Sequence, residues 1–178
     1  MQDKSILEYV IDELKKQGAD KVACSLSNSE KKEFNIEHGE MSLFRTTFNS
    51  SLSIEAFIEG KKGSTSINKI DKESIDRAVV QVIELSQSSN PDKCHDIAES
   101  QSPQIFSCGR SEADLNIMYD SLAEFNQFTK DIFPKIILEA AILDFTKTKT
   151  LVANSNGVSF EVNKGLYGFS PMFTAKDG

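Results

Sequence analysis

The sequence has few of the residues from which metal and nucleophile sites are usually built. Its 178 residues include two histidines, three cysteines, four prolines and no tryptophan. The histidines, His38 and His95, are too far apart to form a His-x-x-x-His pair on one helix face. The cysteines, Cys24, Cys94 and Cys108, are odd in number and widely spaced. This pattern favours a reducing cytosol over a disulfide framework, so we expect a cytoplasmic protein.

The sequence also lacks a basic surplus and a long apolar run. Lys and Arg number 20 against 27 Asp and Glu, which gives a net charge of −7. Direct binding to nucleic acid is therefore not expected, because it requires a basic surface that displaces counterions. No apolar run approaches the ~20 residues of a membrane span. The charged residues Asp3, Lys4 and Glu8 make the N-terminus unlike a signal peptide.

The remaining composition is that of an ordinary globular protein. Hydrophobic residues make up 39% and charged residues 26% of the chain, which argues against wholesale disorder. At this length the chain can form one domain of normal size or two small ones, with a real core.

Periodicity in the first half predicts a helix, a run of strands and a second helix. Apolar residues at helical spacing predict a helix over about 4–17, ended by Gly18. Alternating residues then predict five antiparallel strands, with tight turns at His38-Gly39 and at 59–62. These strands cover residues 22–26, 31–37, 41–47, 52–58 and 63–68. Asp71 is the expected N-cap of the second helix, whose buried stripe runs from Ile75 to Ile83.

The second half begins with a stretch that has no period. Residues 91–110 contain Pro91 and Pro103 and predict an irregular connection. A third helix is expected over about 112–133, closed by Pro134, and strands resume at Lys135. The inward face of this helix is expected to contain Met118, Leu122, Phe125, Phe128 and Ile132.

A stretch near the start of the chain that is predicted to form strands is repeated at the end with a less well preserved pattern. In residues 32–68 and 150–178 a polar turn joins alternating apolar runs, and both copies reach a charged glycine turn. The second copy stops at its turn, Lys176-Asp177-Gly178, so we expect the second unit to be incomplete. The predicted fold is α+β, with two related units that each combine an amphipathic helix and an antiparallel meander. The expected divisions are 1–90, a connection over 91–110, and 111–178.

Candidate sites have simple structural interpretations. Cys94-His95, flanked by Asp92 and Asp96, is the one cluster that suggests a metal. Adjacent residues point in different directions on helices and strands, so a loop pair without a special role is the favoured interpretation. Three acids, Asp71, Glu73 and Asp76, suit a helix N-terminus better than acid–base catalysis.

The other candidates also favour structural roles. His38 is interpreted as a solvated turn residue and Cys24 as a small core residue. Residues 63–66 are better read as the start of a strand than as a phosphate loop, and the phenylalanines Phe125, Phe128 and Phe133 as a core stripe. We therefore predict no catalytic, cofactor-binding or metal-binding residue in this sequence.

An ordered set of segments resembles a known family. A helix, the tripeptide Gly18-Ala19-Asp20 and a strand precede FNIEHGEM, LSIEAFIEGKKGSTSIN and a helix capped by aspartate with a trailing Asn90-Pro91-Asp92. Further on, Ala153-Asn154-Ser155-Asn156-Gly157 precedes an aromatic-rich strand and Ala175-Lys176-Asp177-Gly178. This order resembles the N-terminal domain of the TldD/PmbA family over nearly the whole chain. Cys94 after the turn favours the PmbA (TldE-like) branch.

The resemblance implies a metal-dependent peptidase whose members have also been labelled modulators of DNA gyrase. It implies that zinc is bound by a His-Glu-x-x-x-His motif of the TldD-type subunit, which no position of this sequence matches. A TldD/PmbA-type partner subunit, an oligomer and a peptide substrate are implied as well. For this segment the resemblance implies a scaffold that supports peptide hydrolysis performed elsewhere. The alternative is a freestanding protein- or peptide-binding module, because exposed sheet edges can accept an extended chain.

Overall fold

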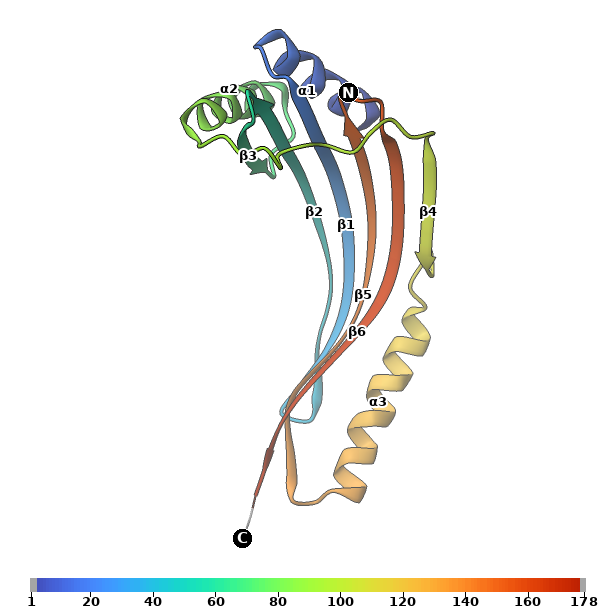
Figure 1. Cartoon of the computed structure of the whole chain (residues 1–178). Coiled ribbons are helices and arrows are strands. Elements are labelled where there is room, and N and C mark those ends of the chain that lie inside the picture. The colour runs from blue at the N-terminus through green and yellow to red at the C-terminus, as the bar shows by residue number, and fades with distance from the viewer. Residues whose placement is uncertain (1–2, 177–178) are drawn as a thin grey trace. The chain divides into compact units, whose positions relative to one another are not determined.

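The computed structural model describes residues 3–176, which form three helices and a six-stranded sheet (Figure 1). The helices are α1 (Asp3–Lys16), α2 (Lys72–Ser88) and α3 (Leu115–Ile132). The strands are β1 (Lys21–Glu37), β2 (Glu40–Ile58), β3 (Lys61–Ile67), β4 (Gln104–Gly109), β5 (Ile136–Asn154) and β6 (Ser159–Ala175). Their order in the sheet is β3-β2-β1-β5-β6-β4. The predicted α+β class is confirmed.

The chain forms two compact units. Unit 1 comprises residues 1–28, 49–107 and 149–163, and unit 2 comprises residues 29–48, 108–148 and 164–178. The long strands β1, β2, β5 and β6 contribute residues to both units. Each unit therefore combines segments from both sides of the predicted connection over 91–110.

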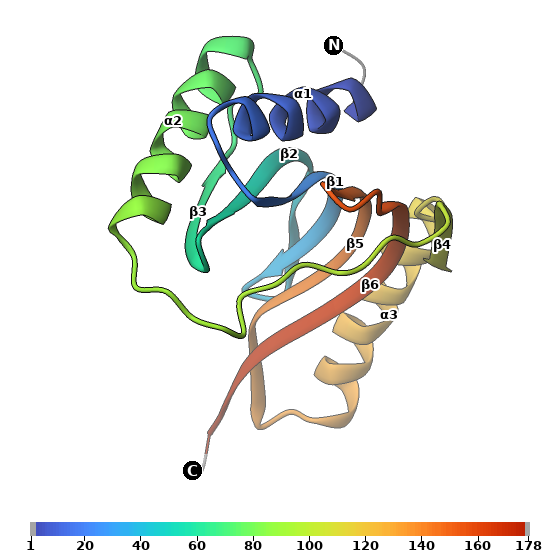
Figure 2. The ribbon, with the colours of Figure 1, turned by 45° about the horizontal axis from the view of Figure 1, so that its top comes forward.

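The core of unit 1 lies between its two helices and the sheet. Figure 2 shows α1 and α2 together beside the strands of this unit. The buried residues of α1 and α2 pack with alternate residues of β1 and β2, as their predicted periodicities require. Gly63 lets β3 approach α2 closely, because a Cβ at this position would lie 2.1 Å from the carbonyl oxygen of Val82.

Polar contacts fix the start of α2. Asp71 caps the helix as predicted, and its Oδ1 accepts a hydrogen bond from the Ser74 N–H at 2.8 Å. A hydrogen bond from Lys69 and this bond from Ser74 lower the pKa of Asp71 to about 2. One turn further on, the Tyr9 hydroxyl of α1 donates to Asp76 at 2.6 Å, and the Lys72 ammonium donates to the same two residues. These bonds connect the two helices of unit 1.

The core of unit 2 lies between α3 and the sheet. Leu122 of α3 packs with Ile36, Leu138 and Ala141 in one buried cluster. The C-terminal half of α3 is bound to the β1–β2 turn, where the Asn126 amide and the Lys130 ammonium both donate to the Gly39 carbonyl.

The predicted inward face of α3 is partly wrong. Phe128 and Ile132 are 52% and 56% exposed, whereas Thr129 is buried. The buried face contains Met118, Leu122, Phe125 and Thr129. The Thr129 hydroxyl donates a hydrogen bond to the Phe125 carbonyl. The helix begins at Leu115 rather than near residue 112, because Asp114 provides its N-cap.

The predicted strands are longer in the structure than in the sequence analysis. Residues 22–26 and 31–37 belong to the single strand β1, and 41–47 and 52–58 to the single strand β2. The predicted connection over 91–110 is irregular only as far as residue 103, where it gives way to β4. Every residue of β4 is exposed, so this short strand lacks the apolar alternation from which strands are predicted.

The strand order agrees with the predicted pair of related units. The hairpins β1–β2 and β5–β6 lie side by side, with β1 and β5 adjacent at the centre. The strands after Glu40 and after Gly157, β2 and β6, each lie one position in from an edge of the sheet. The last two residues of the predicted turn Lys176-Asp177-Gly178 lie outside the described residues.

Candidate functional site

Residues 91–98, here named the crossing segment, run over the sheet of unit 1 between α2 and β4 (Figure 2). At its start, Pro91 forms an antiparallel bridge with Lys61, and the Asp92 N–H donates to the Gly60 carbonyl at 3.0 Å. His95 lies 2.8 Å from the same carbonyl through Nδ1, and its ring packs edge-on against Phe57. His95 therefore has structural partners in the β2–β3 turn.

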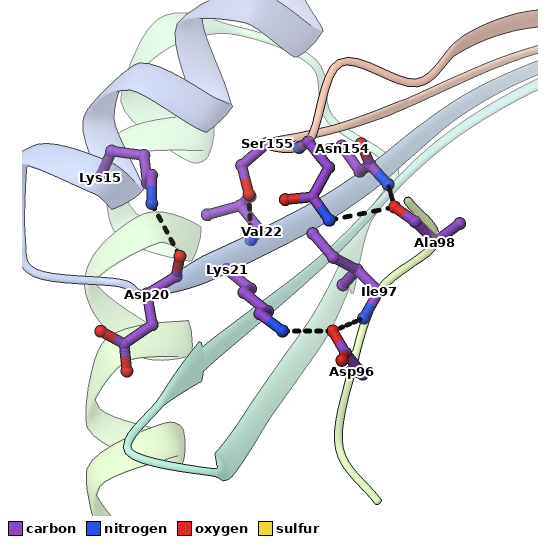
Figure 3. Close-up of polar contacts among 10 residues, drawn as sticks. Lys15, Asp20, Lys21, Val22, Asp96, Ile97, Ala98, Asn154 and Ser155 are labelled. Atoms are coloured by element: carbon purple, nitrogen blue, oxygen red, sulfur yellow. Dashed lines mark hydrogen bonds and ion pairs between the residues drawn. The ribbon is translucent and has the colours of Figure 1, made fainter. Parts of the chain in front are cut away.

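The end of the crossing segment is bound to the start of β1 and to the β5–β6 turn (Figure 3). The Lys21 ammonium pairs with Asp96, and this hydrogen bond, followed by that of the Ile97 N–H, lowers the pKa of Asp96. The Asn154 side chain donates from Nδ2 to the Ala98 carbonyl at 2.7 Å. Polar bonds thus fix both ends of a segment that contains no helix and no strand.

Asn154 also organises the β5–β6 turn. Its Oδ1 accepts hydrogen bonds from the N–H groups of Asn156 and Val158, both at 3.0 Å. The next residue, Ser155, exchanges bonds with Val22 of β1, through its N–H at 2.9 Å and its hydroxyl at 3.0 Å. The turn is therefore joined to β1 by hydrogen bonds as well as closed by its own.

A pocket of about 370 Å³ opens beside this turn, within unit 1. Its walls come from α1, from the residues at the start of β4 and from both strands of the β5–β6 hairpin. Apolar side chains such as Leu7, Ile11 and Phe160 line much of it, and Glu8 and Glu161 add charge. Such a pocket can receive an apolar group, but it contains no pair of groups arranged as nucleophile and base.

The structure does not bring the candidate site residues together. Cys94 is exposed in the crossing segment, and Cys24 is buried under α1, where burial raises its pKa to about 12. His38 has an 86% exposed side chain in the β1–β2 turn, with Nδ1 3.7 Å from a carboxylate oxygen of Glu139. Among residues 3–176, no group of three or more His, Cys, Asp or Glu is close enough together to hold a metal ion.

The remaining candidates have the structural roles expected of them, with one exception. Asp71 caps α2 and Asp76 pairs with Lys72, whereas Glu73 lies on the exposed side of the first turn. Residues 63–66 lie within β3. The exception is the phenylalanine stripe: Phe125 packs in the core of unit 2, but Phe128 and Phe133 are half exposed and contact each other.

The contacts of Lys21, Asp96 and Asn154 were not found from the sequence. The one available signal was the Asn154-Ser155-Asn156-Gly157 run, which was interpreted only as a turn. Its partners lie 56 and 133 residues away in the chain, at Ala98 and Val22. A local sequence pattern cannot predict hydrogen bonds between residues so far apart in the chain.

Part of the chain matches a known protein family. The model of the family described as PmbA/TldA metallopeptidase domain 1 matches residues 22–86. Residues 22–86 therefore resemble the first domain of the PmbA/TldD family. The resemblance noted in the sequence is thereby confirmed. The matched residues include the β1–β2 hairpin, β3 and most of α2.

Solved structures share the fold over nearly all of this chain. TldE from Thermococcus kodakarensis is 16% identical, with a TM-score of 0.77, over 97% of this chain and 40% of its own. A proposed modulator of DNA gyrase from Bacteroides thetaiotaomicron is 14% identical, with a TM-score of 0.77, over 98% and 41%. Another from Thermotoga maritima is 12% identical, with a TM-score of 0.72, over 98% and 40%. The chain thus spans about two fifths of the length of these proteins.

A search of curated proteins found no match. No helix within residues 3–176 has the length and apolar character needed to cross a membrane.

Proposed function

We propose that this chain is the N-terminal scaffold portion of a TldD/PmbA-type peptidase subunit. The observation that carries the proposal is the match of residues 22–86 to the first domain of a metallopeptidase family. The shared fold extends over 97% of the chain, to TldE from Thermococcus kodakarensis. In this role the sheet and its helices support metal-dependent peptide hydrolysis, and the catalytic motif lies outside this segment.

The proposal assigns the zinc to a TldD-type partner subunit. In this proposal that subunit carries the His-Glu-x-x-x-His motif, whose histidines would hold the ion, and zinc would supply the metal-assisted hydrolysis there. The present chain contributes a rigid wall for the peptide and a surface for the partner. The preference for the PmbA (TldE-like) branch, which was drawn from Cys94, belongs to this proposal.

Exposed apolar residues of unit 2 support a partner surface. Phe48 is 74% exposed and Phe173 is 57% exposed, and both lie in unit 2. Exposed large apolar side chains are common in protein interfaces. In the proposed function, the TldD-type subunit covers them.

The alternative is a freestanding module that binds a peptide or a protein and has no enzymatic role. The pocket beside the β5–β6 turn and the exposed edge strand β4 support this function, because an extended chain can pair with β4 and place an apolar side chain in the pocket. Formation of a complex with a TldD-type subunit distinguishes the two functions.

Sedimentation velocity of the chain mixed with a TldD-type subunit from the same source tests the proposal. We expect a stable complex that is weakened at least tenfold by Phe48→Glu. The matched change Ile105→Glu, at a residue 72% exposed in unit 1, should leave the complex intact. Independent sedimentation of the two proteins would contradict the scaffold role and favour the alternative.

A further inference from the structure

A row of alternating charges crosses one face of the sheet in unit 2. Arg45 on β2 places Nε 2.7 Å from Oε1 of Glu33 on β1. Lys31, two residues earlier on β1, lies 3.2 Å from Oε2 of Glu33 and 3.5 Å from Oδ1 of Asp144 on β5. Gly168 on β6 leaves room for Asp144, because a Cβ there would lie 2.9 Å from the same Oδ1. All five residues belong to unit 2.

Glu33 is the buried centre of this row. Its side chain is 2% exposed, and a buried carboxylate is costly unless cations and hydrogen bonds compensate it. Desolvation is the largest influence and would raise the pKa of Glu33, but the favourable interactions with the Lys31 and Arg45 cations together outweigh it and lower the pKa. Glu33 is therefore ionised and holds both cations at fixed positions.

Arg45 uses little of its hydrogen-bonding capacity in this contact. A guanidinium has five N–H donors. Arg45 Nε forms an ion pair with Glu33 Oε1 at 2.7 Å, and within residues 3–176 this oxygen has no partner with hydrogen-bond geometry. Within residues 3–176, Glu33 is the only ion-pair partner of Arg45, whose side chain remains 57% exposed. An arginine whose role is only to link two strands by an ion pair frequently forms two parallel N–H···O bonds with the carboxylate. Here the Nη groups remain available to a second oxyanion.

A second polar group lies beside this pair. Asn35 follows Glu33 by two residues on β1, so both side chains project from the same face of the sheet. Asn35 is 8% exposed, and within the described part of the chain its Oδ1 has no hydrogen-bond donor. A buried acceptor without a donor is unfavourable, and an amide N–H from a ligand would relieve it after a small movement of the side chains.

We propose that this face of unit 2 binds the carboxylate of a peptide, with the Nη groups of Arg45 as donors and Glu33 as the residue that positions them. A peptide end offers a carboxylate for Arg45 next to an amide N–H for Asn35, and so complements both groups. The choice of a peptide as the source of the carboxylate rests on the proposed function. The geometry of Arg45 and Glu33 stands independently of it.

Calorimetric titration of the 178-residue chain tests this site. The probes are trialanine with a free C-terminal carboxylate, its C-terminal amide, and acetyl-Ala-Glu-Ala-amide, which carries only a side-chain carboxylate. We expect the free acid to bind at least fivefold more tightly than the amide. Binding of the third peptide would show that a side-chain carboxylate is also accepted, and would equally support an oxyanion site at Arg45.

The variants Arg45→Gln and Glu33→Gln should remove the preference for the acid, and Arg45→Lys should reduce it at least threefold. Arg77→Gln is the matched control, because Arg77 is 68% exposed on α2 in unit 1 and should not matter. Circular dichroism checks that each variant is folded. If Arg45→Gln is not folded, the acid–amide preference of Arg45→Lys tests the site in its place. Equal affinity for acid and amide, no binding at millimolar peptide, or an unchanged preference in a folded Arg45 variant would overturn the site. Failure of partner binding would contradict the proposed function but would leave the acid–amide difference unchanged.

Discussion

The side-chain amide of Asn154 donates to the carbonyl oxygen of Ala98 at 2.7 Å, although 56 residues separate them in the chain. This bond joins the β5–β6 turn to the crossing segment, and the same side chain accepts two backbone N–H groups within the turn. Asn154 is 8% exposed, so its partners have little access to water if the side chain is removed.

Asn154→Ala should therefore lower the free energy of unfolding by about 2 kcal/mol, because it leaves buried polar groups without partners. Urea denaturation followed by circular dichroism measures the loss. Gln127→Ala, which removes an exposed amide on α3, is the control and should change stability by less than about 0.5 kcal/mol. Equal effects of the two substitutions would show that Asn154 does not organise the turn.

Gly63→Ala should be more damaging than its size suggests. The added methyl group would lie 2.1 Å from the Val82 carbonyl oxygen and 2.5 Å from the Ser86 nitrogen, both in the backbone of α2. Since α2 must move away from β3, we expect a loss of about 3 kcal/mol or more in urea denaturation. Ser64→Ala, at the next and exposed position, should be nearly neutral. If the two variants are equally stable, β3 and α2 are not packed as closely as described.

The N-cap of α2 should make stability depend on pH in the acid range. Hydrogen bonds from Lys69 and Ser74 lower the pKa of Asp71 from 3.8 to about 2 in the folded chain. The stabilisation by its charge is therefore complete above pH 3.8 and disappears as pH falls through about 2. Asn at this position keeps an oxygen acceptor but not the charge. In urea denaturation, the advantage of the wild type over Asp71→Asn should be constant above about pH 5 and shrink toward pH 2. A difference that does not change with pH would contradict the assigned pKa.

The three cysteines should differ in reactivity. Burial raises the pKa of Cys24 to about 12, whereas Cys94 and Cys108 are exposed. Because the thiolate is the reactive form, N-ethylmaleimide at pH 7 should label Cys94 and Cys108 and spare Cys24 until the chain is denatured. Peptide mass spectrometry reads out each site. Labelling of Cys24 at the rate of the other two in the native chain would contradict its place in the core.

Local signals predicted the helices well. Gly18 after an amphipathic stripe marked the end of α1, and Asp71 marked the start of α2, because capping depends on neighbouring residues. The inward face of α3 was predicted less well, because its apolar residues are compatible with two rotations of the helix about its axis. In the structure, Asn126 and Lys130 face the turn at Gly39 and donate to its carbonyl, which favours one of these rotations.

The continuity of the strands and the polar contacts could not be predicted in the same way. The polar run Ser27-Asn28 interrupts the apolar alternation of β1, yet the strand continues between β2 and β5. The side chains of Ser27 and Asn28 have partners in Thr150 and Ser50. β4 forms against β6, where Gly109 and Gly165 allow close contact of the backbones. The pair of Glu33 and Arg45 also depends on the register of two strands, which the sequence of either strand alone does not specify.

The most direct test of the scaffold role is a reconstitution of peptidase activity. The chain alone, the TldD-type subunit alone and their equimolar mixture are assayed for zinc by elemental analysis and for cleavage of a quenched fluorescent peptide. We predict no stoichiometric zinc and no cleavage with the chain alone, and at least tenfold faster cleavage by the mixture than by the TldD-type subunit. About one zinc per chain in the isolated protein, or a mixture no more active than the TldD-type subunit, would contradict the account.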